Sequence, residues 1–369
     1  MKPLDQIFAT ARAKPRHILL PEGHDPRIQA AAVQATAQGL ARITLLGDPA
    51  DIAPALKALG AAEGAIQIID PAHAPDLDLL AAECLRLRAA KGVSADQARV
   101  LATDPLVQAA LRVRLGLADG TVGGAVATTA DTVRAALQFI GRAPGIATVS
   151  SFFLMLSCGE DTKLKGGMIF ADCGLVVAPD AQELAAIARA SAASARALLG
   201  DTPRVALLSF STAGSAEHAS LTRIREALAL VQQAEPELEI DGEIQFDAAL
   251  DDEIRLRKAP GSRLSGRPNV FVFPDLASGN IGYKIAQRLG GLLAIGPILQ
   301  GLARPANDLS RGCTPEDVLA AIAVTAVQAG EADQPNSRTV NTAVMPKPIK
   351  PTIARITDLG SSRANGAPR

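Results

Sequence analysis

The feature that most constrains the fold is a repeated alternation of short apolar runs with alanine-rich stretches of helical period. Three runs, HILL (17–20), ITLLG (43–47) and AIQIID (65–70), alternate with RIQAAAVQATAQG (27–39) and DLDLLAAECLRLRAAKG (76–92). The runs have the length of strands, and the alanine-rich stretches have the length of crossover helices. Strands joined by crossover helices run parallel, in a sheet that is covered on both faces. The pattern therefore predicts an α/β fold with mostly parallel sheets.

A second series of the same kind begins near residue 147. Its apolar runs span residues 145–156, 166–178, 203–211 and 269–276, and its helical stretches span residues 181–200 and 220–234. The last stretch of helical period is PEDVLAAIAVTAVQAG, at residues 315–330. The length of 369 residues suits two domains of ordinary size, so we expect two α/β units.

Residues 331–369 differ from the rest of the chain. They contain several prolines together with Asn, Ser, Thr and Arg, and they show no sustained hydrophobic period. We expect an extended or disordered C-terminal tail. The alternative is an arm that packs on another subunit.

The charge balance argues against one broad class of function. The chain has 37 basic and 38 acidic residues, whereas nucleic-acid-binding proteins usually carry a basic excess or a basic stripe. We therefore expect no nucleic-acid partner, although a local basic cleft for a small anion remains compatible with the balance. No apolar run approaches the roughly 18 residues of a membrane-spanning helix, and the N-terminus has no signal-type apolar stretch. We expect no association with a membrane.

The cysteines and histidines lack the spacing of metal sites. Cys84, Cys158, Cys173 and Cys313 form no CxxC pair and no zinc-ligand pattern, which predicts reduced thiols and a cytoplasmic protein. The four histidines are scattered, so a histidine metal site and a histidine-based triad are both disfavoured. The fingerprints of phosphate-loop and dinucleotide-binding proteins are also absent.

The stretch NDLSRGCTPED (307–317) combines a helix start with candidate functional groups. Thr314 is a hydroxyl cap, Pro315 occupies the first helical position, and Asp317 stands where a capping box places a carboxylate. Ser310 and Arg311 lie just before the free N–H groups of that helix, which favour negative charge. The stretch is either an ordinary capped helix or a site that binds a phosphate or another oxyanion.

Cys313 lies in the same stretch and raises the question of a thiol nucleophile. A helix N-terminus lowers the pKa of a thiol, but no histidine stands nearby to act as its base. We expect Cys313 to be a buried, unreactive cysteine.

Two polar loops follow predicted strands, SFSTAGSA (209–216) and FPDLASGNIGYK (273–284). In open α/β sheets, ligands bind outside the carboxyl ends of the strands, so both loops are within reach of a ligand. The second loop places Gly279 and Gly282 beside Lys284, ahead of a helix. The glycines have an equally plain interpretation as tight-turn residues.

Several long motifs resemble phosphate acetyltransferases (phosphotransacetylases). The resemblance rests on the following segments: LLPEG, LRAAKG, GAVATTADTVRAALQ, SSFFLML, GEIQFDAAL, APGSRLSGRPNVFVFPDLASGNIGYKIAQRLGG, AIGPILQGLARPANDLSRGCTPEDV and AVTAVQA. They occur in the family's order and cover about residues 15–329. The resemblance is to the short form of the family, which lacks the N-terminal regulatory extension.

This resemblance implies reversible transfer of an acetyl group between acetyl phosphate and coenzyme A. It also implies a homodimer of subunits with two α/β/α domains and an active-site cleft between them. We expect domain I at residues 1–146 plus 300–330 and domain II at residues 147–299. The implied partners are acetyl phosphate, coenzyme A and phosphate, with no metal and no tightly bound cofactor.

The family's site residues transfer onto matching positions. Asp317 resembles the general base for the coenzyme A thiol, Ser310 the hydroxyl at the reacting centre, and Arg311 the arginine that binds the phosphoryl group. Arg88 and Arg134 match substrate-binding arginines. Two further substrate-binding candidates are Thr128, where the family has Ser or Thr, and Lys284.

Two alternatives remain at this point. One is a non-catalytic module of the same family that senses acetyl-CoA. The other is a phosphate acyltransferase for a longer group such as butyryl.

Overall fold

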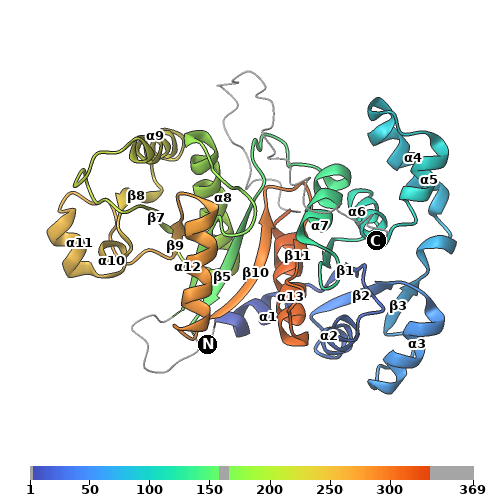
Figure 1. Ribbon diagram of the computed structural model, residues 1–369. Helices are drawn as coiled ribbons and strands as arrows, with labels where there is room; N and C mark the ends of the chain where they lie inside the picture. The colour runs from blue at the N-terminus through green and yellow to red at the C-terminus, as the bar shows by residue number, and fades with distance from the viewer. Residues whose placement is uncertain (1–2, 158–165, 333–369) are drawn as a thin grey trace, which may run out of the picture. The chain divides into compact units, whose positions relative to one another are not determined.

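Two β-sheets organise residues 3–157 and 166–332, the part of the chain that the computed structural model describes (Figure 1). The first sheet has five strands in the order β11-β4-β1-β2-β3, and every neighbouring pair in it is parallel. Its strands are β1 (Arg16–Leu20), β2 (Ala41–Leu46), β3 (Ile66–Ile69), β4 (Gly120–Gly123) and β11 (Ala306–Asp308). The parallel α/β arrangement predicted from the first 140 residues is confirmed.

The second sheet has six strands in the order β10-β5-β6-β9-β7-β8. The pairs β6–β9, β9–β7 and β7–β8 are parallel, whereas β5 pairs antiparallel with both β6 and β10. Its strands are β5 (Ser150–Leu156), β6 (Gly167–Ala171), β7 (Arg204–Leu208), β8 (Glu239–Ile244), β9 (Val270–Val272) and β10 (Leu293–Gln300). The sheets are therefore mostly parallel, as predicted.

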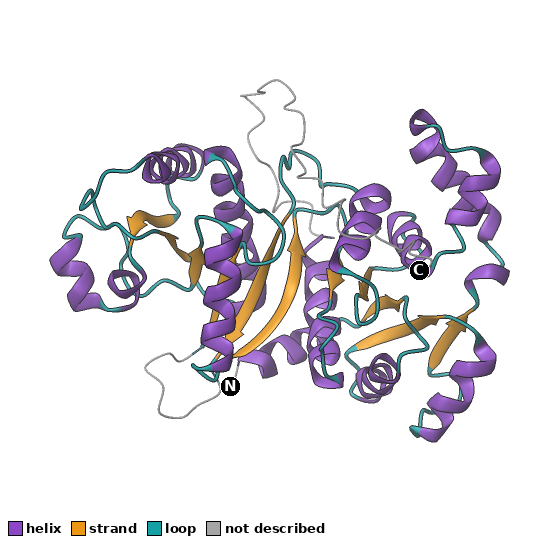
Figure 2. Ribbon diagram, in the orientation of Figure 1, coloured by secondary structure: helices purple, strands orange, loops and turns teal. Residues whose placement is uncertain are grey.

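Helices flank both sheets (Figure 2). Those before β5 are α1 (Pro3–Ala13), α2 (Pro26–Ala37), α3 (Pro49–Ala58), α4 (Leu77–Arg88), α5 (Ala95–Leu101), α6 (Pro105–Arg114) and α7 (Thr129–Ala135). The single turns η1 (Pro71–His73) and η2 (Ala89–Lys91) are 3₁₀-helical, and η3 (Ala136–Ile140), which continues α7, is π-helical. Those after β6 are α8 (Ala181–Leu199), α9 (Ala219–Ala234), α10 (Phe246–Leu250), α11 (Asp252–Lys258), α12 (Leu276–Arg288) and α13 (Pro315–Ala332).

Local sequence signals explain why several helices begin where they do. An aspartate cap followed by proline starts α2, α3 and α6, because the carboxylate accepts free N–H groups and proline needs no donor. At α6, the Asp104 carboxylate accepts the N–H groups of Leu106 and Val107 at 2.9 and 3.0 Å.

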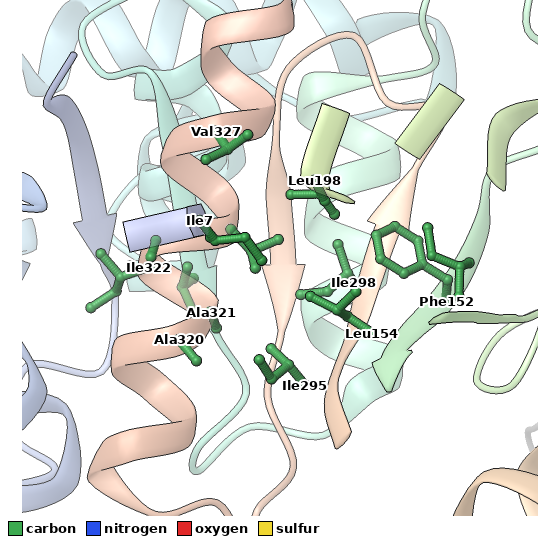
Figure 3. Close-up of a cluster of buried hydrophobic side chains, with 14 of the residues drawn as sticks. Ile7, Phe152, Leu154, Leu198, Ile295, Ile298, Ala320, Ala321, Ile322 and Val327 are labelled. Atoms are coloured by element: carbon green, nitrogen blue, oxygen red, sulfur yellow. The ribbon is translucent and has the colours of Figure 1, made fainter. Parts of the chain in front are cut away.

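The last helix, α13, contributes to a core that continues from one sheet to the other (Figure 3). Its side chains contact α1, α2, β1 and β4 as well as α8 and β10. Ala321 and Ile322 of α13 share this core with Ile298 of β10 and Phe152 of β5. Aliphatic side chains and alanine thus make up most of the interior of a chain that contains no tryptophan, with buried phenylalanines such as Phe152 among them.

Helix α13 and strand β6 end at other residues than the sequence predicted. Helix α13 ends at Ala332, so the first two residues of the expected tail, 331 and 332, are helical; the rest of that tail lies outside the described residues. The predicted strand at 166–178 ends at Ala171, since the following residues form a loop around the buried Asp172. Within the described residues, none of the helices combines the length and the apolar character needed to cross a bilayer.

Candidate active site

A cavity of about 690 Å³ lies at the start of α13. Segments associated with both sheets line it: Thr129 of α7, residues 309–314, Asp317 and Ala321 on one side, and residues of β5, β10, α12 and the β6–α8 loop on the other. Three of the lining residues are cationic, namely Lys284, Arg288 and Arg311, whereas Asp317 is the acidic one. This excess of positive charge favours an anionic ligand.

The start of α13 is a reciprocal capping box. The Thr314 N–H donates to Asp317 Oδ2 at 2.9 Å, and the Asp317 N–H donates to Thr314 Oγ1 at 3.2 Å. The capped helix predicted from the sequence is therefore confirmed. Because Asp317 also lines the cavity, the same carboxylate that caps the helix faces the ligand space.

Ser310 and Arg311 lie in a tight turn just before that helix. The Cys313 N–H donates to the Ser310 carbonyl oxygen at 2.9 Å, and the Gly312 N–H donates to Ser310 Oγ at 3.2 Å. The turn starts at β11, where the Leu309 N–H donates to the Gly123 carbonyl at 2.8 Å. Both side chains are exposed and line the cavity, so the fold brings Ser310, Arg311 and Asp317 together.

Arg27 holds this turn in place, a role that the sequence alone did not reveal. Its guanidinium donates to the carbonyl oxygens of Arg311 at 2.6 Å, Cys313 at 3.3 Å and Ala125 at 2.7 Å. It also forms a two-point ion pair with Asp25, and this hydrogen bonding lowers the pKa of the Asp25 carboxyl. One planar side chain therefore connects the segment after β1 to residues 284 and 286 positions later in the chain.

Glu22 organises a second loop beside the cavity. Its buried carboxylate accepts the N–H groups of four consecutive residues, 124–127, at 2.7 to 3.0 Å. Two of these donors bond to each carboxyl oxygen. The loop leads into α7, where Thr129 lines the cavity.

On the six-stranded side, Asp172 has a similar task. Its buried carboxylate accepts hydrogen bonds from the Ser151 N–H and hydroxyl and from the N–H groups of Gly174, Leu175 and Val176. The pKa of Asp172 lies above its ordinary value, because burial raises it by more than these hydrogen bonds lower it. The arrangement shapes the loop in which Cys173 and Gly174 line the cavity.

The loop predicted at residues 273–284 is largely helical in the structure, so that prediction was wrong. Residues 276–284 belong to helix α12, because Asp275 caps it by accepting the Ser278 N–H at 2.9 Å. A Cβ atom at Gly279 would stand 2.3 Å from the Asp172 carbonyl oxygen. This glycine therefore permits close packing of the helix rather than a turn.

Lys284 lines the cavity from α12, not from a loop. Its ammonium group donates to Asn280 Oδ1 at 2.7 Å and lies 5.8 Å from the centre of the Tyr283 ring. Tyr283 in turn stacks on Phe153 of β5, with ring centroids 3.8 Å apart. The α12 side of the cavity thus combines a cation with an aromatic surface.

The cavity cysteines are poor nucleophiles. Cys313 and Cys173 are buried free thiols, and burial raises the pKa of both. For Cys313, the charge of Arg27 acts in the opposite direction with a smaller effect. Within residues 3–157 and 166–332, no group of His, Cys, Asp and Glu side chains has an arrangement suited to a metal ion.

The remaining predicted substrate-binding residues do not line this cavity. Thr128 is the exposed cap of α7, and its hydroxyl donates to Asp131 Oδ2 at 2.7 Å. Arg134 pairs with Asp131 at 2.5 Å on the same helix. Arg88 is the last residue of α4 and is partly exposed. Their roles remain predictions.

Comparisons with known proteins agree on one family. The family model for phosphate acetyl/butaryl transferases matches residues 3–326. A phosphate acetyltransferase of Paracoccus denitrificans is 65% identical over 328 residues, which cover 89% of this chain and 99% of the relative. One of Thermoanaerobacterium thermosaccharolyticum is 44% identical over 329 residues, covering 89% of this chain and all of the relative. The crystal structure of a phosphotransacetylase from Streptococcus pyogenes superposes with a TM-score of 0.84 at 42% identity, covering 89% of this chain and 98% of that one.

Proposed function

Because the chain belongs to the phosphate acetyl/butaryl transferase family, we propose that acetyl phosphate and the thiol of coenzyme A meet in the cavity at the start of α13. The chain is a transferase that interconverts acetyl phosphate plus coenzyme A with acetyl-CoA plus phosphate. The observation that carries the proposed location is that Ser310, Arg311 and Asp317 line one cavity with excess positive charge. Neither alternative, the sensing module or the transferase of longer acyl groups, gains support from relatives that are named phosphate acetyltransferases.

Arg311 and the N-terminus of α13 bind the phosphoryl end of acetyl phosphate. A guanidinium grips two oxygens at once, and the positive end of the α13 dipole favours an anion. Arg27 supports this role, because its bond to the Arg311 carbonyl at 2.6 Å fixes the backbone from which that side chain extends. Holding the phosphate in this way also leaves the carbonyl carbon open to attack.

The thiol of coenzyme A attacks that carbonyl carbon directly. Asp317 takes the thiol proton, a sulfur–carbon bond forms, and Ser310 donates a hydrogen bond to the charge that develops at the reacting centre. The carbon–oxygen bond to the phosphate then breaks, and the proton passes from Asp317 to the departing phosphate. Cys313 takes no covalent part in this sequence, which agrees with its buried thiol.

The reaction needs no metal and no tightly bound cofactor in this proposal. Phosphate is already a good leaving group, and cationic side chains with the positive end of the α13 dipole supply the positive charge. Turnover should therefore be unchanged after prolonged treatment with a chelator, with the untreated enzyme as its control. A loss of activity that a divalent cation restores would contradict the proposal.

The phosphates of coenzyme A contact residues outside the cavity. We assign this role to Arg88, Arg134 and Thr128, while Lys284 meets the part of the substrate inside the cavity. The Arg134–Asp131 pair is exposed, so it contributes little to stability and can exchange its carboxylate for a phosphate. A rise in KM for coenzyme A with unchanged KM for acetyl phosphate in Arg134→Ala would support the assignment.

The chain forms a homodimer. Ile281 and Ile285 on α12 and Leu289, the residue directly after this helix, recur every fourth residue and are 58%, 54% and 85% exposed. Such a stripe is suited to burial against a second copy. Light scattering on the wild type and on Ile285→Glu tests the proposal, because the charge should shift the mass from two chains to one.

Two further assignments follow from the family. Residues 1–146 with 300–330 form domain I and residues 147–299 form domain II; membership of β11 in the five-stranded sheet supports the return of the chain to domain I. The cytoplasm is the location, and the free thiols of Cys84, Cys173 and Cys313 support a reducing compartment.

One assay tests the reaction as a whole. Purified protein is mixed with coenzyme A and acetyl, propionyl or butyryl phosphate, and thioester formation is followed. Acetyl phosphate should give the highest kcat/KM. The absence of thioester from every donor would refute the catalytic function, and a preference for butyryl phosphate would refute the acyl specificity.

A further inference from the structure

Asp308 is a buried carboxyl group that the proposed reaction leaves without a task. It has no exposed surface and ends β11, two residues before Ser310. Neither of its oxygens makes a hydrogen bond of normal geometry within the described part of the chain. Glu22 and Asp172, the buried carboxylates that shape the cavity loops, accept four and five hydrogen bonds. A buried carboxylate that lacks well-formed hydrogen bonds is costly to ionise, which favours the acid form of Asp308.

The groups around Asp308 restrict where that proton can go. A Cβ atom at Gly124 would stand 2.2 Å from Asp308 Oδ1, so this oxygen lies directly against the backbone. Glu22 is the charged group that faces Asp308, but its oxygens already accept two N–H donors each. The remaining neighbours are the hydroxyls of Thr129 and Thr132 on α7.

The other elements packed against β11 present neutral groups. The Asn307 side chain donates to Thr325 Oγ1 at 2.8 Å and Gln328 Oε1 at 2.7 Å on α13. Its own Oδ1 accepts the Leu299 N–H of β10 at 2.8 Å. The polar groups that face Asp308 are thus the fully occupied Glu22 carboxylate, the hydroxyls of Thr129 and Thr132, and the Leu309 N–H, which also donates to the Gly123 carbonyl at 2.8 Å.

Thr129 connects this buried carboxyl to the cavity. Thr129 is exposed and lines the cavity with Ser310 and Arg311, whereas Thr132 is buried and does not line it. A hydroxyl has one proton to donate. Beside an ionised Asp308, Thr129 would give that proton to the carboxylate and could only accept from a ligand. Beside a protonated Asp308, it accepts and keeps its own proton for an anionic oxygen.

We propose that Asp308, in its acid form, is a positioning residue that makes Thr129 a hydrogen-bond donor to the phosphoryl oxygens of acetyl phosphate. This inference rests on the proposed location of the reaction and adds a phosphate-binding group to Arg311 and the start of α13. No bond is made or broken at Asp308, which keeps its proton through turnover.

The environment of Asp308 gives this arrangement a pH dependence. Burial raises the pKa of Asp308 to about 7; the hydroxyls of Thr129 and Thr132 and the Leu309 N–H lower it, and the charge of Glu22 raises it. The acid form is therefore present below about pH 7 and is lost as the pH rises above that value. The affinity for acetyl phosphate should fall over the same range.

The test measures kcat and KM for acetyl phosphate separately, from about pH 6 to about pH 8.5. Thr129→Val should raise this KM roughly tenfold at low pH with little change in kcat, since it removes one hydrogen bond to a charged group. Thr129→Ser should restore the wild-type value. Asp308→Asn keeps a permanent N–H donor toward Thr129, so it should hold the low KM and abolish the rise seen in the wild type above about pH 7.

Thr132→Val is the matched control, because it changes the same kind of neighbour without touching the cavity lining. At about pH 6, where Asp308 is in its acid form in both proteins, it should leave the KM for acetyl phosphate unchanged. The inference is overturned if Thr129→Val has a wild-type KM, if Thr132→Val raises that KM as much, or if Asp308→Asn retains the wild-type pH dependence. Thioester formation by the wild type tests the reaction itself, so the two failures are distinguishable.

Discussion

The two sides of the cavity differ in the chemistry they present. The side that belongs to α7 and the start of α13 carries Thr129, Ser310, Arg311 and Asp317, all of them able to exchange protons or bind charge. The other side carries aromatic rings, the amide side chains of Asn280 and Gln287 and bare backbone, with cations supplied by α12; each side also has one buried thiol. We infer that the first side performs the reaction and that the second side shapes and holds the acyl donor and the thiol.

A buried carboxylate supports each side, but the two reach their partners differently. Asp172 accepts N–H groups from residues two to four positions later, apart from its bonds to Ser151. Glu22 accepts its four N–H groups from residues 102 to 105 positions away. We call the side with Thr129, Ser310, Arg311 and Asp317 the reactive side and the opposite side the shaping side. The reactive side therefore depends on contacts between distant segments, whereas much of the shaping side is organised locally.

The largest expected effect is on the reactive side. Asp317→Asn should reduce kcat by roughly 10²-fold or more, because the base for the thiol is lost. The amide oxygen can still accept the Thr314 N–H, so the thermal midpoint should change little. A turnover near that of the wild type would reduce Asp317 to a helix cap and remove the difference between the two sides.

The two supporting carboxylates allow a direct comparison. Glu22→Gln and Asp172→Asn should each lower the free energy of unfolding by about 3 kcal/mol, since an amide group cannot accept all of the bonds. Urea unfolding measures this loss. At a temperature where both variants are folded, kcat should fall more in Glu22→Gln, because the loop leading to Thr129 loses its anchor. Equal losses of kcat would contradict the division of labour.

Gly279→Ala tests the packing of the shaping side. The new Cβ would meet the Asp172 carbonyl oxygen at 2.3 Å, so the free energy of unfolding should fall by roughly 2 kcal/mol. Gly261→Ala is the control, because its Cβ has no atom within 4 Å and should be close to neutral. Similar unfolding curves for both variants would show that α12 tolerates a shift away from Asp172.

Asp308→Asn should also change how stability depends on pH. The folded-state pKa of about 7 lies above the ordinary value of 3.8, so the native state binds this proton more tightly than the unfolded chain. Stability from this source is complete below the unfolded pKa and is lost as the pH rises through about 7. Between pH 6 and pH 8 the wild type should lose about 1.4 kcal/mol that Asp308→Asn does not lose. If the free energy of unfolding of the wild type and of Asp308→Asn changed equally with pH, Asp308 would not be the group that holds this proton.

The smallest effect belongs to Cys313→Ala. The thiol is buried beside the reactive side but takes no covalent part, so most of the activity should remain. Steady-state assays with acetyl phosphate measure it. Complete loss of activity in a folded variant would favour an acyl-cysteine route.

The features that could be predicted from the sequence are those formed by residues close together in the chain. The capping box of Thr314 and Asp317 and the neighbouring pair Ser310 and Arg311 lie within eight residues of the chain. The sequence did not reveal the contacts of Arg27 or the buried surroundings of Asp308, because both form only when distant segments meet. The sequence pattern also predicted a loop at residues 276–284, since glycines that permit close packing resemble those of a turn.

The position of β11 has a consequence for the synthesis of the chain. This edge strand pairs with β4, about 185 residues earlier, and the turn that follows it is held by Arg27. A nascent chain can assemble β1 to β4 early, but it has no reactive turn until the last helix has left the ribosome. Incomplete chains should therefore be inactive, however well their first half is folded.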